Sequence, residues 1–177
     1  MMNLYKLTLI SLLAALATVG RFLFSFYPNV QPVTAIIIIC GIWLGPFYSV
    51  VLAVVTTILS NMLLGMGIWT LPQIVSWSLI GLLAGWLGKY RHVIPMYVYA
   101  AFAGVSGYFF GFMMAVTYGQ VGNHFFAYWL SSLPFDTYHA VGNVVFMIVL
   151  YPVLSRLFKQ YESKNIHSFK HPNQSMN

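Results

Sequence analysis

Long apolar runs, separated by short polar segments, fill almost the whole chain, and no other feature limits its fold as strongly. A helix needs about 20 mostly apolar residues to cross the hydrocarbon core of a bilayer. Charged residues make up only 6% of the 177 residues, whereas a soluble domain carries about 25%. So few charges cannot cover a water-exposed surface. The sequence therefore predicts an all-α integral membrane protein.

The apolar runs predict six transmembrane helices with short connections. We place them, in chain order, at residues 4–26, 33–44, 47–64, 71–87, 95–118 and 135–158. Residues 123–133 are amphipathic and aromatic, which is typical of a helix that lies at the membrane interface. We expect residues 1–162 to form one membrane domain and the polar residues 163–177 to form a disordered cytoplasmic tail.

The dipeptide Gly45-Pro46 decides the topology. Proline removes a backbone donor and disfavours helix in the residue before it, so we expect the chain to reverse there rather than continue as one kinked helix. The reversal places most of the eight Lys and Arg residues on one side, namely Lys6, Lys89, Arg91, Arg156, Lys159, Lys164 and Lys170. Cytoplasmic flanks carry the excess of basic residues, so both termini are predicted to be cytoplasmic. The net charge of +6 then reflects topology and not nucleic acid binding.

Two charged residues stand apart from that basic set, on the outer side of the predicted bundle. Arg21 could snorkel to lipid headgroups, hold a substrate carboxylate, amide or phosphate, or pair with Asp136. Asp136, His139 and Asn143 are spaced three and four residues apart, so they share one face of the last helix. Asp136 either complements the helix N-terminus behind Pro134 or contacts a ligand that enters from outside.

Uncharged polar residues collect on the same outer side. The glycine-flanked loop 65–70 carries Trp69, which is either an interfacial anchor or part of a lid over bound solute. Amides beside aromatic rings suit a polar, largely neutral ligand. We therefore predict a substrate-binding site made of Arg21, Asn29, Gln31, Asn61, Trp69, Gln73, Asp136, His139 and Asn143.

The sequence contains none of the patterns that identify an enzyme. It has no Gly-x-Ser-x-Gly elbow, no pair of acidic residues in the membrane part and no phosphate-binding loop. Any ATP hydrolysis would need another chain. His139 has no second His or Cys at ligand spacing, so we expect no metal and no cofactor.

Small residues recur at a spacing of four on the first helix. They are Ser11, Ala14, Ala15 and Thr18. Such faces allow another helix to approach closely. The set serves either internal packing or docking onto a partner protein.

Several motifs resemble those of the S components, the substrate-specific subunits, of energy-coupling factor (ECF) vitamin transporters. The resemblance covers most of residues 4–158. It rests on Pro28-Asn29-Val30-Gln31-Pro32-Val33-Thr34-Ala35, Gly45-Pro46, Ser60-Asn61, Gly65-Met66-Gly67-Ile68-Trp69-Thr70, Gln73 and Gly81-Leu82-Leu83-Ala84-Gly85. S components are small six-span proteins without an ATPase of their own, so an S-component-like bundle is expected.

The resemblance implies a multi-pass protein of the bacterial cell membrane that binds a vitamin from outside. Its partners would be a transmembrane coupling subunit, which docks on an Ala-x-x-x-Ala pair of the first helix, and two ATPase subunits. That strict pair is missing here, and only its small-residue version is present. The most similar subgroup is assigned to cobalamin. Pantothenate is the second candidate, because Arg21 could pair with its carboxylate, and a stand-alone channel or facilitator is the alternative.

Overall fold

The computed structural model describes residues 4–122 and 124–170, and every regular element within them is helical. The elements are α1 (Leu4–Leu23), α2 (Val33–Leu44), α3 (Pro46–Leu64), α4 (Thr70–Leu87), the short 3-10 helix η1 (Gly88–Tyr90), α5 (Met96–Gly122) and α6 (Phe125–Lys170). Five of the helices are long and apolar enough to cross a membrane, whereas α2 has only 12 residues. The predicted all-α architecture is confirmed.

Helix α2 forms the centre of the bundle. Every residue from Val33 to Ile42 is buried, and the helix packs against α1, α3, α4, α5 and α6. Its sequence is apolar on all sides, which is what a helix enclosed by other helices requires. The short second span of the sequence analysis is therefore shielded from lipid by its neighbours.

The chain reverses at Gly45-Pro46, as predicted. Gly45 has a φ of 95°, which ends α2, and Pro46 opens α3 at a position where its missing N–H costs nothing. The Ser49 hydroxyl donates a hydrogen bond of 2.8 Å to the Ile37 carbonyl. Residues of one continuous helix at that separation would lie about 18 Å apart. The bond therefore requires α2 and α3 to run side by side.

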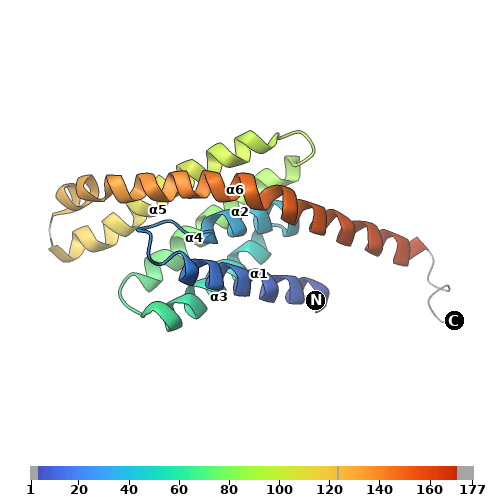
Figure 1. Ribbon diagram of the computed structural model, residues 1–177, viewed down its shortest axis with the longest axis horizontal. Helices are drawn as coiled ribbons and strands as arrows, with labels where there is room; N and C mark the ends of the chain where they lie inside the picture. The colour runs from blue at the N-terminus through green and yellow to red at the C-terminus, as the bar shows by residue number, and fades with distance from the viewer. Residues whose placement is uncertain (1–3, 123, 171–177) are drawn as a thin grey trace.

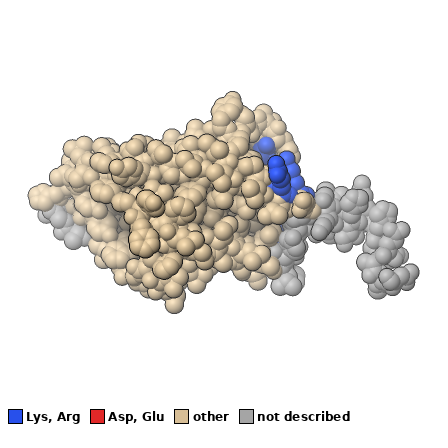
Figure 2. All heavy atoms as spheres, in the orientation of Figure 1, with Lys and Arg blue, Asp and Glu red and all other residues tan. Residues whose placement is uncertain are grey.

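The reversal brings basic residues from three parts of the chain to one end of the bundle. The Lys6 amine lies 4.7 Å from the centre of the Tyr48 ring, and the Arg91 guanidinium lies 5.0 Å from that of Trp43. Figure 1 shows the start of α1, the α4–α5 connection and the end of α6 at the same end. The Lys and Arg atoms visible in Figure 2 gather there too.

Helix α6 corrects two predictions. An interfacial segment at residues 123–133 and a last helix from residue 135 were predicted as separate elements. The structure instead has one helix from Phe125 to Lys170, which contains Pro134 and Pro152. Prolines are tolerated inside membrane helices because neighbouring groups satisfy the freed backbone atoms. Asp136 therefore lies well inside the helix, and its alternative role as a charge at a helix N-terminus is wrong.

The same helix extends into the segment predicted as a disordered tail. Residues 163–170 belong to α6, and residues 171–177 lie outside the described residues. The division of the chain at residue 162 stays a prediction.

Small residues set the close packing of α4 against the α2–α3 hairpin. A Cβ atom at Gly81 would overlap the Ser49 hydroxyl, and one at Gly85 would overlap the backbone of Pro46. The motif Gly81-Leu82-Leu83-Ala84-Gly85 thus lets α4 cover the turn, as small residues do in membrane bundles generally.

Replacing Gly85 with alanine is therefore expected to lower the melting temperature of the detergent-purified protein, because overpacking a tight contact costs about 1–3 kcal/mol. Gly142→Ala is the matched control, since its added methyl would meet only Val30, at 3.5 Å. Thermal unfolding followed by tryptophan fluorescence measures both. Equal melting temperatures for the two variants would contradict the close contact at the turn.

Candidate functional site

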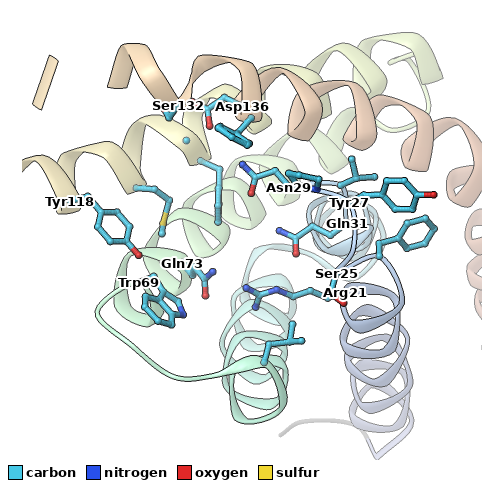
Figure 3. A pocket seen from close by; sticks show the side chains of 18 of the residues that line it. Arg21, Ser25, Tyr27, Asn29, Gln31, Trp69, Gln73, Tyr118, Ser132 and Asp136 are labelled. Carbon is cyan, nitrogen blue, oxygen red and sulfur yellow. Dashed lines mark hydrogen bonds between the residues drawn. The ribbon is translucent and has the colours of Figure 1, made fainter. Parts of the chain in front are cut away.

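A cavity of about 560 Å³ lies at the end of the bundle opposite the basic residues. Its walls come from α1, the α1–α2 connection, the α3–α4 connection, α4, α5 and α6 (Figure 3). The lining residues are Arg21, Phe24, Ser25, Tyr27, Pro28, Asn29, Val30, Gln31, Leu64, Trp69, Gln73, Phe110, Gly111, Met114, Tyr118, Tyr128, Ser132, Phe135 and Asp136. Both polar side chains and aromatic rings line it, as in sites for small organic ligands.

Arg21 is held in a fixed position on one wall. Its Nη1 atom donates hydrogen bonds to the Ser60 hydroxyl at 2.6 Å and to Asn61 Oδ1 at 2.8 Å. The guanidinium also lies 5.4 Å from the centre of the Trp77 ring, within reach of a cation–π interaction. The side chain lines the cavity (Figure 3), and its partners are neutral residues rather than Asp136.

Asn61 connects Arg21 to the loop that carries Trp69. Its Oδ1 accepts the bond from Arg21, while its Nδ2 donates to Thr70 Oγ1 at 3.0 Å and to Gln73 Oε1 at 2.9 Å. Asn61 is buried and does not line the cavity. Predicted as a contact residue, it lies one layer behind the wall and orients the residues that do line it.

The α3–α4 loop places Trp69 at the cavity. Gly65, with a φ of 110°, ends α3, and Thr70 Oγ1 accepts a 3.3 Å hydrogen bond from the Gly67 amide. A Cβ atom at Gly67 would overlap the Trp69 ring, so the indole rests on bare backbone. The glycines are thus needed for the conformation of this loop and for the position of its one large side chain.

Asp136 occupies the opposite wall (Figure 3). It is 3% exposed, and its Oδ2 accepts a 3.0 Å hydrogen bond from Ser132. A Cβ atom at Gly111 would overlap the carboxyl group, so glycine is required for α5 to approach it. Ser132 and Gly111 were missed as site residues. Ser132 lies one helical turn before Asp136, and Gly111 lies on the neighbouring helix α5. Neither residue belongs to a recognisable sequence motif.

His139 and Asn143 lie below the cavity instead of lining it. His139 Nε2 is 3.0 Å from Thr34 Oγ1, which also accepts a 3.0 Å bond from the Trp77 indole. Asn143 donates a 3.2 Å hydrogen bond to the Ala103 carbonyl. Both residues are 1% exposed. They join α6 to α2 and α5 and form part of the layer under the cavity floor.

Among the other predicted site residues, Asn29, Gln31 and Gln73 line the cavity. Three side chains of α5 also line the cavity but were not part of the predicted site. Phe110, Met114 and Tyr118 recur every fourth residue and present one helical face to the cavity. That spacing, next to an outer helix end, could have indicated them. Tyr118 also stacks on Tyr128 of α6, with ring centres 5.2 Å apart.

The four small residues of α1 divide between two faces. Ala14 and Thr18 are buried in the bundle, whereas Ser11 and Ala15 are exposed on the outside. Only the second pair is available to a partner. Within the described residues, no group of three or more His, Cys, Asp or Glu side chains could hold a metal ion.

The fold and the cavity together define a multi-pass membrane protein with a cavity at one end of its helical bundle. A family model described as "ECF transporter, substrate-specific component" matches residues 5–151. The chain therefore belongs to this family, whose members are substrate-binding subunits and not ATPases. Comparison with curated proteins and with solved structures gives no match.

The hydrogen bonds of Asn61 yield a test of the loop. Replacing Asn61 with alanine removes one of the two acceptors of Arg21 and the donor to Thr70. We therefore expect amide hydrogen exchange in residues 65–70 to accelerate about tenfold, the effect of losing about 1.4 kcal/mol of local stability. Asn143→Ala is the control, since it removes a buried asparagine with a single hydrogen bond elsewhere. If both variants leave exchange in the loop unchanged, Asn61 does not hold it.

Proposed function

We propose that this chain is the substrate-binding subunit of an ATP-driven ECF-type vitamin importer and captures its solute from outside a bacterial cell. The observation that supports this most directly is the placement of the cavity at the end of the bundle opposite the Lys and Arg residues other than Arg21. Basic residues mark the cytoplasmic side of a membrane protein. The cavity then opens toward the exterior, and both termini are cytoplasmic.

For the solute we propose cobalamin first and pantothenate second. The preference for cobalamin comes from the resemblance of the sequence motifs. Asn29, Gln31 and Gln73 supply neutral hydrogen-bonding groups, and Trp69 and Tyr118 supply aromatic surface, which suits the carboxamides and the apolar macrocycle of cobalamin. A cavity of about 560 Å³ would enclose pantothenate, whereas the larger cobalamin would extend beyond its rim.

For the partners we propose a transmembrane coupling subunit and two ATPases. The chain has no phosphate-binding loop of its own, so the energy must come from other subunits. Ser11 and Ala15 are exposed one turn apart on α1, with the exposed Leu12 between them. We propose this outward strip for the docking of the coupling subunit, because small residues allow two helices to approach closely.

The proposed orientation predicts which residues a membrane-impermeant maleimide can reach. Cys40 is buried, and Cys40→Ala provides a background without cysteine. In intact cells Ile68→Cys should react with the reagent, while Lys89→Cys should react only after the membrane is opened. Both positions are exposed at the protein surface, so a difference in labelling between them reflects the side of the membrane and not burial in the protein. Labelling of Lys89→Cys from outside would overturn the orientation.

The proposed activity predicts uptake that depends on both the ATPases and the cavity. Cells that express this chain should accumulate radiolabelled cobalamin or pantothenate, and deletion of the ATPase subunits should abolish this. Trp69→Ala should weaken binding by about tenfold or more, since truncating an aromatic side chain that a bound ligand covers commonly costs about 2 kcal/mol.

Trp86→Ala is the matched control for Trp69→Ala, because Trp86 is exposed near the opposite end of α4. Its affinity should equal that of the wild type. Uptake that persists without the ATPases would refute the importer, whereas equal affinities of the two tryptophan variants would refute the site.

A further inference from the structure

Two opposite charges face the cavity without pairing with each other. Arg21 and Asp136 lie on facing walls, with Asn29 and Gln31 between them (Figure 3). Each is held by neutral residues: Arg21 by Ser60 and Asn61, and Asp136 by Ser132. The protein keeps a positive and a negative group apart across a space that is large enough for a solute.

Part of the guanidinium remains available to a ligand. Both hydrogen bonds of Arg21 come from Nη1, and within the described residues Nη2 and Nε have no hydrogen-bond partner. Those two nitrogens form one edge of the planar fork that arginine presents to a carboxylate or a phosphate in a bidentate contact. The bonds to Ser60 and Asn61 fix the plane of the fork, so the free edge is preorganised.

The carboxylate of Asp136 is set up in the complementary way. An ionised carboxylate only accepts hydrogen bonds, and Ser132 is the one hydrogen-bond donor that the described residues give it. Gly111 leaves room for the carboxyl group against α5, in a place where any larger residue would displace it. Burying such a group is costly unless donors satisfy it. A ligand that brings N–H or O–H groups would do so.

We propose that the cavity recognises a ligand with two chemically different parts: an anionic phosphate or carboxylate that binds Arg21, and N–H or O–H donors that bind Asp136. This inference rests on the proposed function, because it requires that the cavity is the solute site. It also names Gly111 and Ser132 as positioning residues for the carboxylate. Both cobalamin, through its phosphate and carboxamides, and pantothenate, through its carboxylate and hydroxyls, belong to this chemical class.

The test uses ligand pairs that differ in the anionic group. Pantothenate is paired with pantothenol, in which an alcohol replaces the carboxylate. Cyanocobalamin is paired with cobinamide, which lacks the whole nucleotide loop that contains the phosphate, so the pantothenate pair is the stricter of the two. Affinities for the purified full-length protein are measured by calorimetry. Arg21→Gln should weaken binding of the anionic member about tenfold or more, because a hydrogen bond to a charged group contributes roughly that factor. It should change binding of the member that lacks the anionic group little.

Asp136→Asn keeps the size of the side chain and removes its charge. It should weaken both members of a pair by a similar factor, because both retain the donor groups. Gly111→Ala, which keeps both charged residues in the sequence but displaces the carboxyl group of Asp136, should reproduce the Asp136→Asn pattern. Misfolding is checked for each variant by its thermal unfolding, since a misfolded protein would lose both members of a pair and its melting transition together.

The outcomes separate this inference from the proposed function. If the wild type binds one pair but Arg21→Gln weakens both members equally, the division of roles is overturned while the solute site stands. The same holds if Asp136→Asn has wild-type affinity for both members. If the wild-type protein binds neither pair, the proposed solutes are overturned and the inference with them.

Discussion

The structure depends on the burial of one short helix that cannot cross a membrane alone. Helix α2 has 12 residues and is about 18 Å long, whereas the hydrocarbon core is about 30 Å thick. Its ends would expose backbone groups to lipid, where each unsatisfied group costs several kcal/mol. The reversal at Gly45-Pro46 and the cover supplied by the surrounding helices remove that cost. They also fix which end of the bundle every later segment reaches.

The shortness of α2 also explains why there is a cavity. The helix begins at Val33, directly after the lining residues Asn29 and Gln31. The surrounding helices α1, α4, α5 and α6 extend past the start of α2, so the centre of the bundle is unfilled at the end where the cavity lies. Side chains packed around the start of α2 form the floor of the cavity. Thr34 binds both Trp77 and His139, and Phe110 stacks on His139 with ring centres 5.0 Å apart.

Much of this arrangement follows from the sequence because lipid imposes simple rules. Apolar runs of sufficient length placed α2, α3 and α4 to within one residue, and α2 was predicted with the bounds that the structure shows. The ends of α1 and α5 were placed to within four residues, whereas α6 is much longer than predicted. The glycine–proline pair gave the reversal. Six of the nine predicted site residues line the cavity, since polar side chains in a membrane segment seldom face lipid.

The predictions that the structure corrects also have physical explanations. The rule that polar residues point inward does not say whether they point at a cavity or at another helix. His139 and Asn143 share a face with Asp136 but lie one and two turns deeper, where α2 and α5 fill the space. Asn61 serves other side chains from behind the wall. The continuous course of α6 through Pro134 was missed because, in a membrane, the neighbouring groups that decide whether a proline ends a helix are distant in sequence.

Helix lengths give the two charges of the cavity different depths. From Arg156, at the basic end of α6, to Asp136 the helix rises about 30 Å, which is the thickness of the hydrocarbon core. From Lys6 to Arg21, helix α1 rises only about 22 Å. Asp136 therefore lies nearer the outer end of the bundle than Arg21, which neutral partners and the Trp77 ring stabilise at its deeper position. A ligand of the proposed class would then enter with its anionic group first.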